Sequence, residues 1–305
     1  MTDKVLIVGA TGSFGGALLT ELLDRGIPCR ALLRNPARLS IRPGLEIVAG
    51  DATSHADLTR AADGCGAIVW GFNVSYEHWH KEVEPATEVL CRVAATQGLT
   101  VLFPGNVYAL PAGSSRPLDE SVPAAPPTAK GELRMRVEAR LAAASEQGAQ
   151  VIVLRCGDFF GHHGRSAWLD QIAGKAASKG VLRYPGPWNV RHAWAFLPDV
   201  AAAGAELLAR REQLARFEAF HFAGHALTGH ELAETIERVV NRPLRRRGFP
   251  WSVIRAVGLV VPLLRELHAM RYLWLEPLEL EDSKLVSIIG RVPTTPLEEA
   301  LKQAL

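Results

Sequence analysis

The sequence predicts an α/β protein with a Rossmann-type, doubly wound parallel sheet and a smaller C-terminal lobe. Short apolar runs alternate with amphipathic stretches through the first half of the chain, which is the pattern of successive βαβ units. Three glycines, at positions 9, 12 and 15, separate the first apolar run from the first amphipathic stretch. After about Gly157 the alternation loosens and clusters of tryptophan appear.

The individual elements follow from residue type and spacing. Residues 4–10 form a continuous apolar run that predicts a buried strand. Residues 15–26 carry apolar side chains at helical spacing up to Gly26, a residue type that ends helices. Further strands are predicted at residues 28–34, 45–51, 66–72, 100–106 and 149–157, and further helices at residues 55–64, 82–98 and 128–141. Residues 110–127 are too rich in proline to be helical and predict a loop.

This order of elements predicts two domains and one cleft. We expect a Rossmann domain over residues 1–156, to which later segments can return, and a substrate-binding lobe formed mainly by residues 157–305. The crossovers between parallel strands should be right-handed. Ligands of such sheets bind outside the carboxyl ends of the strands. The cleft should therefore be surrounded by residues 9–15, Arg34, Asp51, residues 71–73, residues 104–106 and residues 156–160.

Composition and charge exclude several classes of protein. The 305 residues are 48% hydrophobic and 22% charged, which is ordinary for a globular protein. A formal net charge of +2 gives no reason to expect nucleic acid as a partner. Four cysteines show neither C-x-x-C spacing nor the density of a disulfide framework, so we expect reduced thiols and a cytoplasmic location. His162 and His163 have no third residue at metal-ligand spacing, so no metal site is predicted.

Membrane insertion is not expected from the sequence. The N-terminus shows no signal-peptide pattern. The most apolar run, residues 253–264, is too short to span a bilayer and is interrupted by Arg255 and Pro262. We expect a buried helix there, with a membrane-surface contact or a homodimer contact as the alternative.

The glycine trio predicts a site for a pyrophosphate. Gly9 permits a tight turn, Gly12 lets the backbone approach the phosphates, and Gly15 lets the helix pack closely on the strand. The free N–H groups at the helix start, together with the helix dipole, suit an anion. The trio has the required strand before it and helix after it. The residues predicted to form this site are Gly9, Thr11, Gly12, Ser13, Phe14 and Gly15.

The spacing G-A-T-G-x-x-G resembles the short-chain dehydrogenase/reductase superfamily, especially its extended and atypical branches, which include NAD-dependent epimerases and dehydratases. "AGDATSHADLTRAADGCGAIV" resembles the segment in which an aspartate meets the adenine, which implies that role for Asp51, with Ala52 beside it. "LRCGDFFG" resembles the R-x-G-x-x-Y/F-G segment that leads into the substrate lobe, and "AWAFLPDVAAAGAELL" resembles the late strand and helix that carry Asp199. "GNVYA" resembles the end of the fifth strand. Around the cofactor the resemblance also implies Gly71, Pro104, Gly105 and Asn106.

The end of the second predicted strand bears on the choice between NAD and NADP. A carboxylate there would bind the ribose hydroxyls and repel a 2′-phosphate. The segment "LLRNPARL" instead offers Arg34, with Arg38 a turn away and no acid nearby. An arginine fork suits a phosphate. We therefore favour NADP(H); under the alternative, NAD(H), Arg34 is a surface arginine that stacks on the adenine.

The catalytic positions depart from the pattern of the superfamily. The resemblance implies a serine near the end of the fifth strand and a tyrosine followed four residues on by a lysine. In a register set by Glu138, these positions are Pro104, Lys130 and Arg134. A slip of register would make Lys130 the lysine and Pro126 the tyrosine. Neither alignment restores the triad, so the usual tyrosine mechanism is not expected.

Lys130, Arg134 and Glu138 lie at i, i+4 and i+8 and so share one face of a helix. Glu138 could pair with Arg134, and Lys130 could act as a general acid or base. The pattern K-x-x-x-R-x-x-x-E resembles the isoflavone-reductase-like and NmrA-like atypical members, in whose reductases a lysine handles the proton; this implies the same role for Lys130. One alternative is a solvated helix face with i,i+4 pairs. Another is a non-catalytic NADP(H)-binding regulator that senses redox state, since the NmrA-like group includes such proteins.

Other candidates surround the same cleft. They are Asn73, Tyr76, Asp158, Phe159, Arg191, His192 and Trp194. Tyr76 could supply a phenol, but it fits packing against Trp79 as well. Trp194 equally fits the core of the lobe. The leading hypothesis is an NADP(H)-dependent oxidoreductase acting on a small carbonyl or hydroxyl substrate, with epimerase or dehydratase chemistry open because it begins with the same hydride step.

Overall fold

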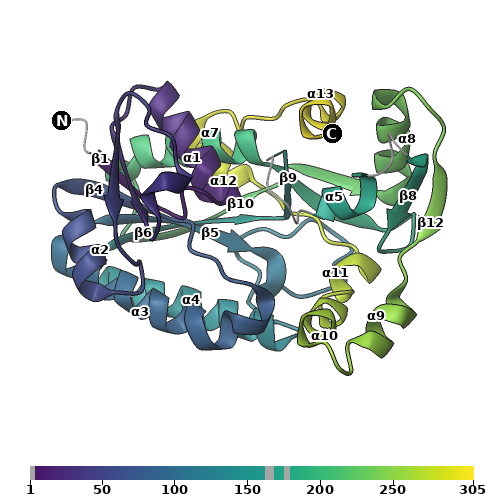
Figure 1. Ribbon diagram of the computed structural model, residues 1–305, viewed down its shortest axis with the longest axis horizontal. Helices are drawn as coiled ribbons and strands as arrows, with labels where there is room; N and C mark the ends of the chain where they lie inside the picture. The colour runs from purple at the N-terminus through teal and green to yellow at the C-terminus, as the bar shows by residue number, and fades with distance from the viewer. Residues whose placement is uncertain (1–3, 162–167, 175–178) are drawn as a thin grey trace.

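The computed structural model describes residues 4–161, 168–174 and 179–305 (Figure 1). A seven-stranded sheet has the order β10-β6-β5-β4-β1-β2-β3, and every neighbouring pair in it is parallel. This confirms the predicted doubly wound α/β fold. Its strands are β1 (Lys4–Val8), β2 (Cys29–Leu33), β3 (Leu45–Ala49), β4 (Cys65–Trp70), β5 (Thr100–Asn106), β6 (Gln150–Cys156) and β10 (Phe217–Phe222).

Helices cover both faces of this sheet (Figure 1). One face carries α1 (Ser13–Asp24), α7 (Leu197–Ala209) and α12 (Ser283–Ile289), and the other carries α2 (His55–Ala62), α3 (Trp79–Gln97) and α4 (Ala129–Glu146). The burial of β1 on both of its faces explains why its residues from Val5 to Val8 are all apolar. Leu6 and Val8 belong to the core on one face, while Val5 and Ile7 belong to the core on the other. Because successive side chains of a strand point to opposite faces, a sheet buried on both faces needs an unbroken apolar run.

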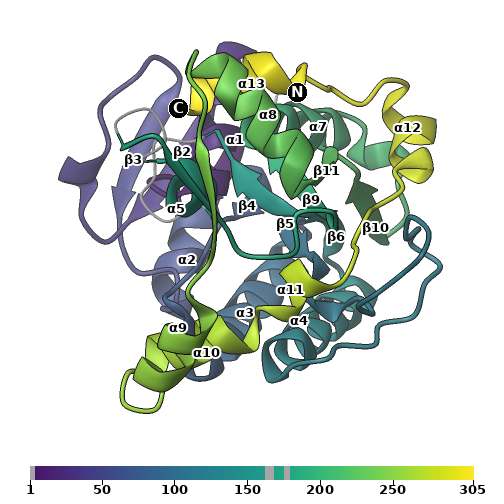
Figure 2. The ribbon, with the colours of Figure 1, turned by 90° about the vertical axis from the view of Figure 1, so that its right-hand side faces the viewer.

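The smaller lobe lies at one end of the sheet (Figures 1 and 2). Its two small sheets have the orders β11-β9-β7 and β12-β8. Its strands are β7 (Asp158–Phe160), β8 (Val181–Tyr184), β9 (Arg191–Phe196), β11 (His225–Thr228) and β12 (Arg245–Gly248). Its helices are α5 (Trp168–Ala173), α8 (Gly229–Val239), α9 (Trp251–Val257), α10 (Pro262–Ala269), α11 (Tyr272–Leu275) and α13 (Leu297–Ala304). Short 3₁₀ helices are η1 (Pro36–Arg38), η2 (Tyr76–His78), η3 (Val107–Ala109) and η4 (Arg211–Gln213).

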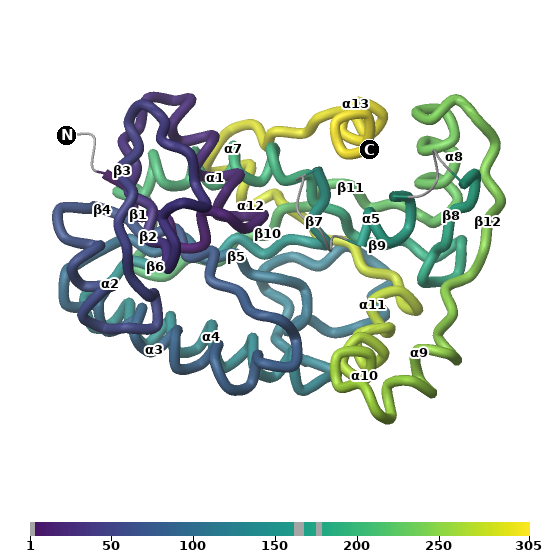
Figure 3. The backbone as a smooth tube through the Cα atoms, in the orientation of Figure 1, coloured from purple at the N-terminus to yellow at the C-terminus, as the bar shows by residue number. Residues whose placement is uncertain are grey.

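The chain crosses between the two parts more than once (Figure 3). Beyond residue 156 it forms β7 and β9 in the lobe, returns to the main sheet with α7 and β10, and goes back to the lobe with β11. Strand β10 pairs with β6, and α7 packs against α1. The Rossmann sheet is therefore completed by residues from the second half of the chain.

The prediction of one buried helix at residues 253–264 is wrong. The run is divided between α9 and α10, and the turn between them is open to solvent. Leu259 is 82% exposed and Val260 is 81% exposed. Pro262 starts α10, because a proline lacks the N–H that a helix interior requires but fits the first turn. Within the part of the chain that the structure describes, no helix combines the length and the apolar character needed to cross a membrane.

Candidate functional site

The loop between β1 and α1 is held in a conformation that only glycine permits. Gly9 has φ of 77°, and a Cβ at this position would lie 2.3 Å from the carbonyl oxygen of Gly71, at the end of β4. A Cβ at Gly15 would lie 2.4 Å from the carbonyl oxygen of Gly9. The Gly12 N–H donates to that same oxygen at 2.8 Å. The three backbone segments thus meet without side chains between them, at the carboxyl end of the sheet.

The start of α1 is free to meet an anion. Gly12 precedes the helix, and no side chain of the described residues caps its first turn. The N–H groups of that turn therefore lack the partner that a capping residue would supply. The side chain of Phe14 packs in the core and does not face the cofactor loop's anion site. Its ring is buried and stacks on Phe159, with 6.2 Å between the ring centroids. Only the backbone of Phe14 is left to face a phosphate.

The groups predicted at the adenosine end follow β2 and β3. Arg34 and Arg38 are both exposed, and neither is ion-paired with a residue that the structure describes. The Asp51 carboxylate accepts hydrogen bonds from the Thr53 N–H at 2.9 Å and from its hydroxyl at 2.8 Å. The Asp51 N–H donates to Asp57 at 3.0 Å. These bonds fix the turn after β3, with Ala52 buried beside it.

Helix α4 presents Lys130 to the junction between the two parts. The Thr128 hydroxyl accepts from the Gly131 N–H at 3.2 Å and so caps the helix. A Cβ at Gly131 would lie 2.1 Å from the carbonyl oxygen of Tyr108, so α4 begins pressed against η3, just past the end of β5. Lys130 is only 7% exposed. Its ammonium group forms an ion pair with Glu266 of α10.

Aromatic rings and a carbonyl complete the surroundings of the Lys130 amine. Nζ lies 3.4 Å from the carbonyl oxygen of Tyr76, and 5.2 and 6.0 Å from the ring centroids of Tyr76 and Trp79. Glu138 on the same helix is also buried, at 7% exposure. The interpretation of this helix face as a solvated surface is therefore wrong for Lys130 and Glu138.

The suggested pairing of Glu138 with Arg134 is not formed. Glu138 instead binds Arg155 of β6, with 2.6 Å between Oε2 and Nη2 and 3.1 Å between Oε2 and Nε. The guanidinium of Arg134 lies over the rings of Trp79, at 4.7 Å, and Phe103, at 5.4 Å. Its Nε is shut off from solvent and has no hydrogen-bond partner among the described residues. Burial lowers the pKa of Arg134, and no carboxylate of the described chain is paired with it.

Glu266 is a site residue that the sequence interpretation missed. It follows Lys130 by 136 positions, and no spacing rule connects residues so far apart. One signal was present: Glu266 is the single acid between Arg245 and Arg271, in a stretch that is otherwise basic or apolar. A single acid in such a segment is a candidate for an ion pair. Here Glu266 forms that ion pair with Lys130.

A partly buried tyrosine, Tyr76, lies beside Lys130 and contacts a buried one, Tyr108. The hydroxyl oxygens of Tyr76 and Tyr108 are 2.7 Å apart. Burial raises the pKa of Tyr76, and it raises the pKa of Tyr108 well above its usual value. Both phenols therefore stay protonated at neutral pH and can donate hydrogen bonds. The packing of Tyr76 on Trp79 is also observed, with ring centroids 5.2 Å apart.

Asp158 and His192 contact each other directly. His192 Nε2 lies 2.7 Å from Asp158 Oδ2. On the other side of the ring, Nδ1 lies 3.0 Å from the carbonyl oxygen of Leu273, which can only accept a hydrogen bond. The imidazole is stacked on Trp274 at 3.8 Å between centroids. The predicted residues Asp158 and His192 are thus brought together.

The remaining predicted residues are engaged in packing or in hydrogen bonds. Asn73 accepts from the Trp79 indole at 3.1 Å. Asn106 accepts from the Tyr108 N–H at 3.1 Å and caps η3. Trp194 is buried in the lobe, as the packing interpretation has it. Pro104 and Gly105 belong to β5, Arg191 is ion-paired with Glu279 and Glu231, and His162 and His163 lie outside the described residues.

Comparison with protein-family models finds a match for the segment that contains the glycine loop. The family model described as "NAD(P)H-binding" matches residues 9–103. Residues 9–103 are therefore similar to an NAD(P)H-binding domain. This confirms the predicted resemblance to NAD(P)-binding proteins in the segment that contains the cofactor loop.

Solved structures share the fold of this chain over nearly its whole length. A putative epimerase from Burkholderia cenocepacia has a TM-score of 0.81 and 17% sequence identity, and the match covers 99% of this chain and 96% of that one. MoeE5 in complex with UDP-glucuronic acid and NAD has a TM-score of 0.78 and 16% identity, with 99% and 97% covered. At such identities the likeness shows the fold alone.

Curated relatives match shorter segments. A (4-alkanoyl-5-oxo-2,5-dihydrofuran-3-yl)methyl phosphate reductase from Streptomyces griseus is 35% identical over 107 residues, which is 35% of each protein. A 3 beta-hydroxysteroid dehydrogenase/Delta 5-->4-isomerase from Mycobacterium tuberculosis is 40% identical over 65 residues, 21% of this chain and 18% of that protein. The matched segments thus span about a third or less of these relatives.

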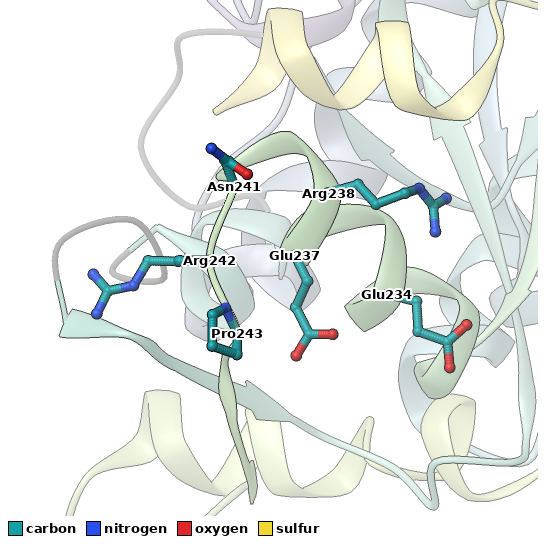
Figure 4. Close-up of a pocket in the computed structure, with 6 residues that line it drawn as sticks. All are labelled: Glu234, Glu237, Arg238, Asn241, Arg242 and Pro243. Atoms are coloured by element: carbon teal, nitrogen blue, oxygen red, sulfur yellow. The ribbon is translucent and has the colours of Figure 1, made fainter.

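A hollow on the surface of the lobe is separate from the Rossmann cofactor loop. It is lined by Glu234, Glu237, Arg238, Asn241, Arg242 and Pro243, from α8 and the turn that follows (Figure 4). Helix α8 lies at the opposite end of the molecule from α1 (Figure 1). The hollow is a charged surface feature, in which Glu237 also binds Arg246 at 3.3 Å.

The network that supports α4 gives a prediction on pH. His221 of β10 is fully buried, its Nδ1 lies 2.8 Å from the Leu118 carbonyl oxygen, and its Nε2 lies 3.3 Å from Arg155 Nη1. A carbonyl on one side and a guanidinium on the other require a neutral ring, and burial lowers the pKa of His221 below its usual 6.5. As pH falls below that value, the unfolded chain takes up a proton that the folded protein does not. The free energy of unfolding should then fall, by about 1.4 kcal/mol per pH unit at the steepest.

Denaturant unfolding of the wild-type protein and of His221→Asn at neutral and mildly acidic pH measures this effect. Asparagine retains a donor for Leu118 but does not titrate. We expect a shallower fall of stability with acid in the variant. Equal slopes for the two proteins would mean that His221 is not the group responsible.

Proposed function

We propose that this protein is an NADP(H)-dependent oxidoreductase that acts on a small carbonyl or hydroxyl substrate, with Lys130 as the proton donor and acceptor. The observation that carries the proposal is the buried, ion-paired Lys130. In the register set by Glu138, Lys130 stands at the position predicted for the tyrosine of the resembled superfamily. It lies just past the carboxyl end of β5, on the edge of the sheet at which α1 also begins. Ligands of parallel sheets bind at that edge.

The cofactor fits the backbone of this chain. Gly9, Gly15 and Gly71 form a cradle that any Cβ would fill, and the uncapped start of α1 offers N–H groups to a pyrophosphate. Asp51 would meet the adenine, and Arg34 with Arg38 would bind a 2′-phosphate. When bound, the nicotinamide supplies or accepts the hydride.

The side chains around Lys130 suit the proton half of the reaction. In the direction of reduction, the substrate carbon gains the hydride and its oxygen takes a proton from Lys130 Nζ. Glu266 supplies the counter-charge of the ammonium group before that transfer. The hydroxyl of Tyr76 is hydrogen-bonded to that of Tyr108. When Tyr108 is the donor in that bond, Tyr76 can donate a hydrogen bond to the substrate oxygen. The curated relative from Streptomyces is named as a reductase, which supports this direction.

The proposal is tested by turnover. The purified protein is mixed with NADPH or NADH and a panel of small ketones, aldehydes and conjugated enones, and the loss of the reduced nicotinamide absorbance is followed. We expect oxidation of NADPH with at least one class of substrate. Tight NADPH binding without turnover of any substrate, in either direction, would instead favour the redox-sensing regulator.

Cofactor preference should depend on Arg34. In Arg34→Ala the affinity for NADPH should fall by at least about tenfold, because one charge-assisted hydrogen-bond partner of the 2′-phosphate is lost. The affinity for NADH should be unchanged. Arg42→Ala is the matched control, since Arg42 is a partly exposed arginine nearby that forms an ion pair with Asp24 at 3.0 Å. Titration calorimetry with both cofactors measures the effect, and a parallel loss of NADH affinity would contradict a 2′-phosphate contact.

A further inference from the structure

Helices α9 and α10 and the turn between them, residues 251–269, form a helical hairpin that stands at one edge of the molecule (Figures 1 and 2). Its outward side is apolar. At the tip Leu259 and Val260 are more than 80% exposed, and Val253 on α9 is 59% exposed. Val257, Val261 and Leu263 are exposed as well. Single exposed apolar residues are common, but a contiguous group of them marks a contact surface.

The inner side of the hairpin is firmly attached, so the exposure of its outer side is not fraying. Ile254 is buried, and the Trp251 indole donates to the carbonyl oxygen of Pro185 at 2.5 Å. Glu266 of α10 holds Lys130. A Cβ at Gly258 would lie 2.9 Å from the backbone nitrogen of Arg265, so the two helices meet tightly at the turn. The fold therefore presents the apolar tip in a fixed position.

The hairpin carries more positive than negative charge. Residues 251–269 contain two arginines and one acid, Glu266, whose charge is matched by Lys130. Arg255 and Arg265 lie on the hairpin itself and are exposed. Within the described parts of the chain neither is ion-paired. A hairpin that combines an exposed apolar tip with two exposed arginines complements a surface that is apolar inside and anionic outside.

A second copy of this chain fits the hairpin less well. The apolar group comprises about six side chains, whereas a stable interface takes about 20–30 residues from each partner. In a symmetric dimer the same patch would face itself, and one small interface would then contain Arg255 and Arg265 of both copies. Like charges placed against each other oppose association.

We propose that the α9–α10 hairpin docks this protein on an anionic lipid surface. Leu259 and Val260 enter the boundary between the headgroups and the acyl chains, and Arg255 and Arg265 bind the lipid phosphates. This is a peripheral contact, made by side chains at the end of a short hairpin. It is independent of the proposed reaction.

Vesicle co-sedimentation of the full chain tests this. We expect binding to phosphatidylcholine vesicles that contain phosphatidylglycerol and little binding to pure phosphatidylcholine. Leu259→Asp/Val260→Asp should abolish binding, and each of Arg255→Gln and Arg265→Gln should weaken it by about fivefold. Ile41→Asp is the matched control, because Ile41 is 89% exposed but lies in the loop between β2 and β3. It should bind like the wild-type protein.

Other outcomes would overturn the proposal. Failure to bind anionic vesicles, equal binding to neutral ones, or binding that survives Leu259→Asp/Val260→Asp would each do so. Light scattering on the same proteins tests the alternative of a dimer contact. If the wild-type protein were a dimer and the double variant a monomer, the hairpin would bind a second copy of the chain and not a lipid surface. Thermal unfolding of each variant verifies that these exposed positions leave the fold intact.

Discussion

Gly9→Ala is expected to abolish measurable binding of NADPH and NADH and to lower the free energy of unfolding by about 3 kcal/mol. Two effects combine at this position. The backbone has φ of 77°, a left-handed conformation that disfavours any side chain, and the added Cβ would lie 2.3 Å from the Gly71 carbonyl oxygen. The end of β4 would be pushed away from the loop, and the cradle for the pyrophosphate would open. Cofactor titration and denaturant unfolding measure the two losses.

Two further alanine variants separate these effects. Gly26 has φ of 73°, but a Cβ there would meet nothing within 4 Å. Gly26→Ala should therefore show only the conformational cost, about 1–2 kcal/mol, with cofactor affinity unchanged. Gly15 lacks the left-handed backbone, yet its Cβ would lie 2.4 Å from the Gly9 carbonyl oxygen. Gly15→Ala should lose cofactor affinity. If Gly9→Ala bound NADPH as Gly26→Ala does, the cofactor would not approach this loop.

The first six strands of the main sheet could be predicted because they lie where short, mainly apolar segments alternate regularly with helical patterns. Strand β10 was not predicted, and its sequence shows why. It reads FEAFHF, in which Glu218 and His221 interrupt the apolar residues. In the described part of the chain it is an edge strand that pairs with β6 alone, and its paired residues lie 66 positions apart in the sequence. A short pattern with polar positions does not reveal so distant a partner, so the seventh strand emerges only from the folded chain.

In the candidate site, too, features set by residues close in sequence could be predicted, and contacts between residues far apart in sequence could not. The glycine loop could be predicted because its conformation depends on neighbouring residues. Helical spacing placed Lys130, Arg134 and Glu138 on one face, but it could not choose their partners. Glu138 binds Arg155 of β6 and Lys130 binds Glu266 of α10. Both partners come from elements that tertiary packing brings to α4.

The apolar run at residues 253–264 illustrates a limit of hydrophobicity as a guide. Its composition predicted burial, because apolar side chains leave water when the fold gives them a place. Gly258 and Pro262 instead divide it into two short helices joined by a turn. The hairpin then buries Ile254 and exposes Leu259 and Val260. An apolar composition indicates that a segment favours burial. It does not say whether the rest of the chain or a binding partner buries that segment.

Lys130→Ala should lower kcat by about 10²–10⁴-fold, the range that general acid–base catalysis contributes. Affinity for NADPH should be little changed, because the predicted cofactor contacts come mainly from the glycine loop and from Arg34. Lys130→Arg separates charge from proton transfer. A guanidinium can replace the ammonium as the partner of Glu266, but it does not give up a proton at neutral pH. We therefore expect Lys130→Arg to bind cofactor normally and to be nearly as slow as Lys130→Ala.

Glu266→Gln distinguishes catalysis from structure in the same experiment. The amide keeps the shape of the side chain and can still accept a hydrogen bond from Lys130, but it lacks the counter-charge. Turnover should fall less than in Lys130→Ala, and the pH profile of kcat should change. Lys302→Ala is the control, since Lys302 forms an exposed ion pair with Glu298 at 2.9 Å and should leave turnover unchanged. If Lys130→Arg retained wild-type kcat, Lys130 would act through its charge alone, and the proton would have to come from another group, with Tyr76 the nearest phenol.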